Sequence, residues 1–223
     1  MSNPKEQAKP RKPKKALSVA DVLSYNPKTI PFEGKWLKAI GEPELKGAWL
    51  IYGESGMGKT SFAMQLGRYL CSINDDLWYR TAYNSLEEGI SKSIQDAYKR
   101  TGMANVARRF LLLDKEPIED LKIRLKDRRS PDIIFIDSVQ YSGLTRKTYK
   151  ELVDTFSNKL FIWLSHADGD NPKGALANDI YYDANVCILV KGFIATTTKS
   201  RHGGDGEIIV SESKAKEYWS IKQ

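Results

Sequence analysis

The chain has 223 residues, which is enough for one large domain and too few for two of ordinary size. A hydrophobic fraction of 41% excludes a wholly disordered protein. The formal net charge of +7 is concentrated in the first 15 residues, so composition alone does not make the remainder a nucleic-acid-binding protein.

The N-terminal segment is rich in lysine and proline and cannot bury apolar surface, so we predict a disordered basic tail over residues 1–16. Such a tail can hold phosphate backbones loosely, or it can be a solvated leader. Residues 17–47 are predicted as a lead-in segment with several turn signals, including a short helix capped near Ser18–Asp21. Residues 48–223 are predicted as one core domain.

The two cysteines, Cys71 and Cys187, form neither a CxxC pair nor a metal-ligand spacing. We therefore expect buried free thiols in a reducing, cytoplasmic environment. The charged N-terminus lacks the apolar stretch of a secretory signal. The longest apolar run, Val186–Ala195, is too short to span a membrane and contains Lys191.

Strands alternate with helices from residue 48 onward. In chain order the sequence predicts a strand at Trp49–Tyr52, a helix at Lys59–Cys71, a strand at Leu77–Tyr83, a helix at Leu86–Arg100, a strand at Phe110–Leu113, a helix opening at Pro117, a strand at Ile133–Ile136, a helix at Lys150–Leu160, and strands at Phe161–Leu164 and Asn185–Val190. Such alternation indicates parallel βαβ units with helices on both faces, which is a three-layer α/β fold.

The pattern changes after Lys199. Glu207–Val210 and Tyr218–Ile221 are predicted to form a terminal antiparallel hairpin or meander, with Gly203, Gly204 and Gly206 in the turn before it. The expected sheet is therefore mainly parallel with a short antiparallel extension.

A phosphate-binding pattern, GxxxxGK[ST], lies between the first predicted strand and the first core helix. Its residues are Gly53, Glu54, Ser55, Gly56, Met57, Gly58, Lys59 and Thr60. The glycines let backbone N–H groups curl around phosphate oxygens, and the helix N-terminus adds the positive end of its dipole. Lys59 can reach the β- and γ-phosphates of ATP, and the Thr60 hydroxyl can ligate magnesium. We predict that this loop and Ser61 bind ATP with Mg²⁺; the alternative is a chance glycine turn.

Asp137 ends the apolar strand Ile133–Ile136. Open α/β sheets place their ligand-handling groups at such strand ends, and a carboxylate there can hold the water shell of magnesium. An aspartate at a strand end can also be a turn former, but an upstream phosphate loop favours the functional reading of Asp137.

With these motifs in place, the sequence resembles the RecA/RadA/DnaB superfamily of P-loop ATPases, in a minimal form like that of phages and mobile elements. The segments that carry the resemblance are Ile40–Gly47 before the phosphate loop, Ser85–Glu88 after the second core strand, Ile136–Gln140, Ser165–His166 after a later strand, and Lys199–Gly203. It spans about Ile40 to Val210. The resemblance implies a RecA-like fold and ATP hydrolysis.

The same resemblance implies roles for single residues. Glu87 would polarise the attacking water, with Glu88 as the alternative. His166 would sense the γ-phosphate, and Arg201 would reach the ATP site of a neighbouring subunit. Structural explanations stand beside each role: the glutamates suit the start of a helix, the histidine can be a satisfied structural residue, and the arginine can be an ordinary surface residue.

Two predicted loops carry basic residues suited to single-stranded DNA. Residues 141–150 contain Arg146, Lys147 and Lys150 near two tyrosines, and residues 167–175 contain Lys173. Bases stack on aromatic rings and phosphates pair with cations in single-strand grooves. A solvated loop with Tyr149 in the core is the alternative.

Three functions compete at this stage. The first is a RecA-like ATPase acting on DNA in recombination, annealing or unwinding, assembled as a ring or filament. The second is a nucleotide-dependent switch, such as a helicase loader or a transposition-target ATPase. The third is a small-molecule kinase, which is disfavoured because Glu87, Asp137 and His166 are suited to activating water.

Overall fold

A computed structural model describes residues 15–73 and 79–221 of the chain. Most of the predicted basic tail and the first residues of the predicted strand Leu77–Tyr83 lie outside the described residues. The helices are α1 (Val19–Leu23), α2 (Gly34–Ile40), α3 (Lys59–Leu70), α4 (Lys92–Thr101), α5 (Ile118–Leu125), α6 (Arg146–Thr155), α7 (Ala175–Asp183) and α8 (Glu212–Ser220), with 3₁₀ turns η1 (Met103–Val106) and η2 (Val139–Tyr141).

The strands form one mixed, mainly parallel sheet. They are β1 (Gly47–Gly53), β2 (Thr81–Ser85), β3 (Phe110–Asp114), β4 (Ile133–Asp137), β5 (Leu160–Asp168), β6 (Asn171–Pro172), β7 (Val186–Lys191), β8 (Ile194–Ser200) and β9 (Glu207–Ile209). Their order is β3-β2-β4-β5-β1-β7-β8-β9, and β6 pairs with the end of β5. Strands β3 through β7 of this order are parallel, whereas the pairs β7–β8, β8–β9 and β5–β6 are antiparallel.

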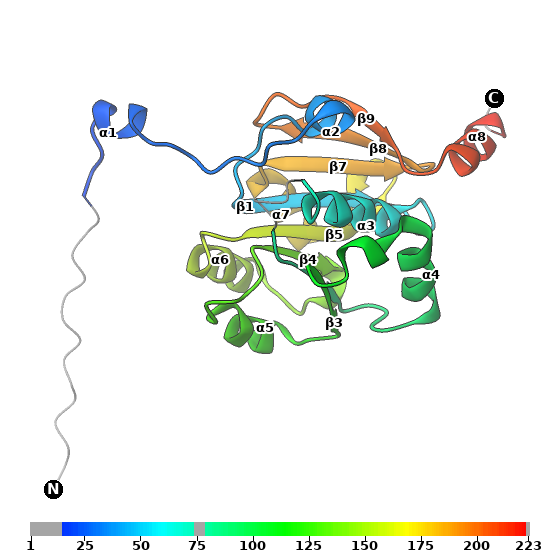
Figure 1. Cartoon of the computed structure of the whole chain (residues 1–223), viewed down its shortest axis with the longest axis horizontal. Helices are drawn as coiled ribbons and strands as arrows, with labels where there is room; N and C mark the ends of the chain where they lie inside the picture. The colour runs from blue at the N-terminus through cyan, green and yellow to red at the C-terminus, as the bar shows by residue number, and fades with distance from the viewer. Residues whose placement is uncertain (1–14, 74–78, 222–223) are drawn as a thin grey trace, which may run out of the picture.

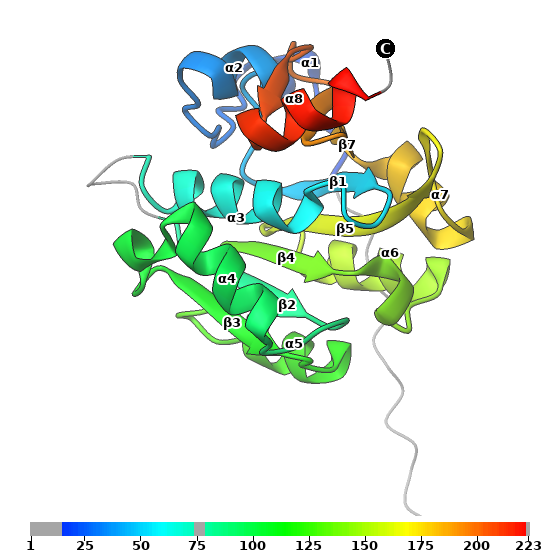
Figure 2. The ribbon, with the colours of Figure 1, turned by 90° about the vertical axis from the view of Figure 1, so that its right-hand side faces the viewer.

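Alternate residues of each central strand face opposite layers. In β1, Trp49 and Ile51 join the core under α3 and α4, while Leu50 and Tyr52 join the core under α5, α6 and α7. Both faces of the sheet are therefore covered, and Figures 1 and 2 show helices on each side of it. The three-layer α/β fold with a mainly parallel sheet, predicted from the sequence, is confirmed.

The register brings the carboxyl ends of the central strands to one edge of the sheet. Gly53 of β1 pairs with His166 of β5, Asp137 of β4 pairs with Leu164, and Ser85 of β2 pairs with Asp137. The residues that follow these strands therefore share one edge, which is where open α/β sheets bind ligands.

The prediction of a terminal strand at Tyr218–Ile221 is wrong. This segment belongs to helix α8, and the partner of β9 is β8, which forms a hairpin with β7. Helix α8 buries Ala215 and sets Tyr218 and Trp219 against the tight turn at Gly192, where an added Cβ would lie 2.3 Å from the Tyr218 ring. Packing around that turn fixes the helix.

Two predicted helices begin elsewhere. The helix expected from Leu86 begins at Lys92, because Ser91 caps it by accepting a hydrogen bond from Ile94 N–H, while residues 86–90 form turns. The helix expected from Lys150 begins at Arg146, because Thr145 caps it by accepting from Thr148 N–H. Each start is therefore set by a hydroxyl residue at the N-cap.

The N-terminal helix α1 stands away from the body of the molecule on an extended segment, as Figure 1 shows. Its Ser18–Asp21 capping box matches the predicted short helix, and none of its residues is buried. Of the described helices, none is long and apolar enough to cross a membrane.

Candidate active site

The phosphate loop joins the end of β1 to the start of α3. Gly56 and Gly58 have φ values of +78° and +101°, a region that favours glycine. Gly53 is needed for a different reason, since a Cβ there would lie 2.1 Å from the Val190 carbonyl oxygen of the neighbouring strand. The glycines therefore leave the backbone N–H groups of the loop unobstructed by side chains at these positions.

Lys59 folds back over this loop. Its Nζ donates to the carbonyl oxygens of Gly53, at 2.8 Å, and Glu54, at 2.9 Å. Burial lowers the pKa of Lys59, and the nearby carboxylates of Asp137 and Glu87 act in the opposite direction. The ammonium thus lies beside the place where phosphates would enter, opposite two acidic groups.

Asp137 lies at the end of β4 beside this lysine. The buried Tyr83 hydroxyl donates a short hydrogen bond to Asp137 Oδ2. Burial raises the pKa of Asp137 to about 6; the bond from Tyr83 lowers it, and Glu87 raises it further. Burial also raises the pKa of Tyr83, while a hydrogen bond from the Thr60 side chain acts the other way. Tyr83 is therefore bonded to one predicted magnesium ligand, Asp137, and lies near the other, Thr60.

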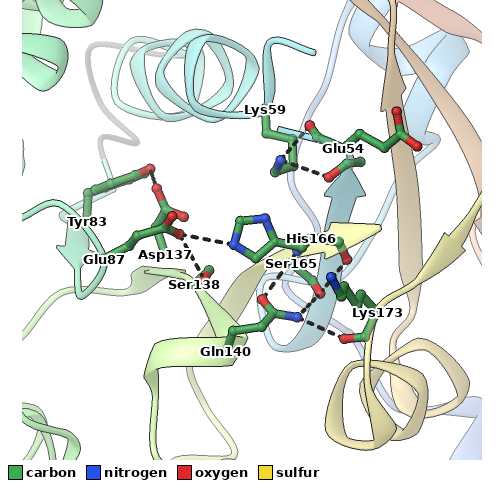
Figure 3. A network of polar contacts seen from close by, with 11 residues as sticks. Glu54, Lys59, Tyr83, Glu87, Asp137, Ser138, Gln140, Ser165, His166 and Lys173 are labelled. Atoms are coloured by element: carbon green, nitrogen blue, oxygen red, sulfur yellow. Dashed lines mark hydrogen bonds and ion pairs between the residues drawn. The ribbon is translucent and has the colours of Figure 1, made fainter. Parts of the chain in front are cut away.

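Glu87 lies in a turn whose backbone is hydrogen-bonded to the end of β4. The N–H groups of Leu86 and Glu87 both donate to the Asp137 carbonyl oxygen, at 2.7 and 3.1 Å. Glu87 Oε2 accepts from Ser138 Oγ at 3.2 Å and lies 3.3 Å from His166 Nε2. Figure 3 shows these three side chains meeting beside Asp137.

Glu88 bonds to a different partner. Its Oε2 accepts from Ser91 Oγ at 3.0 Å, and the residue is exposed. The expectation that both glutamates open a helix is wrong, because α4 begins four residues after Glu88. The structure brings Glu87, and not Glu88, into contact with Ser138 and His166.

His166 is linked to the hairpin that follows β5. Its N–H donates to Gln140 Oε1 at 3.3 Å, and Gln140 Nε2 donates to Ser165 Oγ and to the Lys173 carbonyl oxygen, both at 2.9 Å. These contacts, visible in Figure 3, tie η2, the end of β5 and the β5–β6 hairpin together. Any movement of His166 is therefore coupled to the segment that carries Lys173.

The oxygen donors fit a magnesium ion. Among the described residues, no group of three or more His, Cys, Asp or Glu side chains could form an all-protein metal site. Magnesium in nucleotide sites takes one or two protein oxygens and completes its shell with phosphate and water. Thr60 and Asp137 supply such oxygens next to Lys59, and Tyr83 bonds to Asp137 near Thr60.

The crystal structure of flagellar accessory protein FlaH from Methanocaldococcus jannaschii is similar in fold. The TM-score is 0.57, with 17% sequence identity, and the match covers 81% of this chain and 91% of that one. The fold is RecA-like. No protein-family model matches the sequence, and no curated protein matches it. At this identity the likeness to FlaH shows the fold alone.

In the RecA-like fold of this chain, Arg201 lies far from the phosphate loop. Its N–H donates to the Asn185 carbonyl oxygen at 3.0 Å, next to the pairing of Ser200 with Val186 at the start of β7. The phosphate loop is at the other end of the strands. Arg201 is exposed there, so any role in ATP hydrolysis requires a second subunit. Lys199 instead caps α7 through the carbonyl oxygens of Tyr181 and Tyr182.

The two segments predicted to be DNA-binding loops contain regular structure. Arg146 and Lys150 lie on α6 and pair with Asp179, at 3.5 Å, and Asp154, at 3.3 Å. Tyr149 is buried, with its hydroxyl bonded to Asp183 at 2.8 Å. Residues 167–175 form the β5–β6 hairpin and the start of α7. The prediction of open loops is therefore wrong for most of these residues.

Three residues of the site were not predicted from the sequence. Ser138 and Gln140 follow a buried strand, so their position at the sheet edge could have identified them. Tyr83 lies inside a strand whose residues are all buried, where an aromatic side chain is the expected filling. Only the structure shows that its hydroxyl contacts Asp137.

Proposed function

We propose that the chain is a magnesium-dependent ATPase. The observation that supports this most is the arrangement around Glu87: a carboxylate beside the phosphate loop, contacted by Ser138 and His166 and facing Lys59. A kinase transfers the γ-phosphate to an acceptor other than water, so it does not need a carboxylate that activates water. The RecA-like fold supports nucleotide binding in general.

The chemistry follows from this geometry. Glu87 takes a proton from a water molecule as the water oxygen bonds to the γ-phosphorus and the bond to the ADP oxygen breaks. Ser138 and His166 hold the Glu87 carboxylate in place. Lys59 leaves its loop carbonyls and pairs with the β- and γ-phosphates. Thr60 and Asp137 would hold a magnesium ion, which would supply positive charge to neutralise the phosphate oxygens.

DNA is the substrate that we propose for the work done with ATP. Tyr141 in η2 is 56% exposed, and Lys147, six residues further along the chain, and Lys173, whose carbonyl oxygen bonds to Gln140, are exposed and have no ion pair among the described residues. An exposed aromatic ring with flanking cations suits stacking of single-stranded bases. Gln140, next to Tyr141, connects this surface to His166. The predicted basic tail would add non-specific contacts to phosphate.

The test is phosphate release from ATP with and without single-stranded DNA. Stimulation by DNA, lost in Tyr141→Ala with basal hydrolysis retained, supports the proposal. Hydrolysis that DNA does not change favours a switch activated by a protein partner. Transfer of the γ-phosphate to an added nucleoside instead of water would contradict the ATPase assignment.

A further inference from the structure

Tyr83 lies where the two predicted magnesium ligands meet. It comes from β2, whereas Thr60 comes from α3 and Asp137 from β4. Its side chain is 0% exposed, its hydroxyl donates to Asp137 Oδ2, and the nearby Thr60 side chain lowers the pKa of the same hydroxyl. The phenolic oxygen thus joins β2 to β4 at the edge of the sheet, beside the start of α3, and Figure 3 shows the bond between Tyr83 and Asp137.

The ring that carries this hydroxyl is held by its neighbours. It stacks on Phe135, with 5.9 Å between ring centroids, and is tilted against Phe110 at 6.2 Å. A fully buried ring packed in this way has few alternative rotamers. The hydroxyl is therefore a fixed donor aimed at one oxygen of Asp137, which leaves Oδ1 free of that bond.

We propose that Tyr83 is the positioning residue of the magnesium site, holding the Asp137 carboxylate in register with Thr60 so that both can serve the ion. The proposal rests on the proposed function and adds to it a residue outside the sequence motifs. Magnesium demands near-ideal octahedral geometry, so a small displacement of Asp137 weakens metal binding. Partners that orient metal ligands commonly affect metal affinity about 10- to 100-fold.

The competing explanation is that the bond only satisfies a buried hydroxyl. Tyr98 indicates that a buried tyrosine hydroxyl in this core does not require a hydrogen-bond partner. Its hydroxyl is buried with no hydrogen-bond partner among the described residues, and its ring packs against the same Phe110, at 6.0 Å. The fold thus tolerates a solitary tyrosine hydroxyl close by. Tyr98→Phe is therefore the matched control for Tyr83→Phe.

The experiment titrates Mg²⁺ into ADP-saturated protein by calorimetry and, separately, ADP into protein in EDTA. We expect Tyr83→Phe to weaken Mg²⁺ binding about tenfold or more, while ADP affinity in EDTA stays at the parental value. Tyr98→Phe should leave both affinities unchanged. The ADP titration in EDTA also reports whether each variant is folded.

Two results would overturn the proposal: unchanged Mg²⁺ affinity in Tyr83→Phe, or an equal loss of ADP affinity in EDTA, which would show a general structural role. Failure of the proposed function looks different. In that case the parental protein itself binds no ADP, or Lys59→Ala binds ADP in EDTA as tightly as the parent does.

Discussion

Glu87 and Glu88 are adjacent in the sequence but have different surroundings. Glu87 contacts Ser138 and His166 at the edge of the sheet, whereas Glu88 bonds to Ser91 near the start of α4. A water molecule attacking a phosphate in the loop would be near the first of these carboxylates. The two residues therefore form a natural pair for a comparison of activity.

We predict that Glu87→Gln lowers ATP turnover by about 10² or more, because the general base is lost. Its affinity for ATP should be nearly unchanged, since glutamine keeps the shape of the side chain. Glu88→Gln should keep parental turnover. Steady-state phosphate release at saturating Mg·ATP measures both, and a parental rate in Glu87→Gln would remove this residue from the mechanism.

Asp137 provides a prediction about stability. Its pKa rises to about 6 through burial, from a usual value of 3.8, so the folded chain holds this proton more tightly than the unfolded chain does. Ionisation of Asp137 between about pH 4 and pH 6 therefore destabilises the metal-free fold, by on the order of 2–3 kcal/mol.

Asp137→Asn should accordingly be more stable than the parent in EDTA above pH 6, while losing the effect of Mg²⁺ on nucleotide binding. The advantage should shrink as the pH falls toward 4, where the parental carboxyl is protonated in both states. Urea unfolding at several pH values measures the difference. If the variant is less stable than the parent at pH 7.5, ionised Asp137 does not destabilise the metal-free fold.

The strands are the elements that the sequence predicts best. β1, β4, β5 and β7 carry runs rich in β-branched and aromatic residues, because these central strands are buried on both faces. The sequence does not predict helix α7, since only Ala177 and Ile180 of its residues are buried and two positions define no helical period. The sequence predicts a strand in place of helix α8, because Tyr218 and Trp219 favour strands and the packing around Gly192 is not encoded locally.

The residues of the site also divide into those that a local sequence pattern predicts and those that it does not. The phosphate loop and Asp137 are predictable because their motif and strand-end position report a local geometry. The contacts of Tyr83 with Asp137 and of Glu87 with His166 join elements far apart in the chain, at separations of 54 and 79 residues. Contacts of this kind depend on the register of the sheet, which no local pattern encodes.

The junction of β1 with the phosphate loop provides an element-scale prediction. Gly53→Ala places a Cβ 2.1 Å from the Val190 carbonyl oxygen, so β1 and β7 must separate; we expect a loss of about 3 kcal/mol. Gly56→Ala meets no atom within 4 Å and should cost about 1–2 kcal/mol through its positive φ alone. Urea midpoints measure both, and equal losses would mean that the strands accommodate the methyl group.

At the scale of the whole molecule, Arg201 and the phosphate loop lie at opposite ends of the strands. A shared site therefore needs head-to-tail contact between subunits, which closes into a ring or propagates as a filament. An arginine supplied from a neighbour stabilises charge in the transition state. If Arg201 completes a neighbour's site in this way, turnover per subunit should rise with protein concentration.

Arg201→Ala should lower turnover while sparing ATP binding. Mixing it with Glu87→Gln subunits should restore part of the activity, because some interfaces then pair an intact Glu87 with an intact Arg201. Phosphate release from the mixture, compared with either variant alone, is the measurement. Full activity of Arg201→Ala in a strict monomer would end the shared-site account.

The central claim is that residues 53–60 bind Mg·ATP, and calorimetric titration of Mg·ATP into the parental chain and into Lys59→Ala tests it most directly. We predict saturable binding at one site per chain. Loss of the charge-assisted contact in Lys59→Ala should weaken it by about 1.5–3 kcal/mol, which is roughly 10- to 150-fold. No binding by the parent, or equal affinity in Lys59→Ala, would contradict the account.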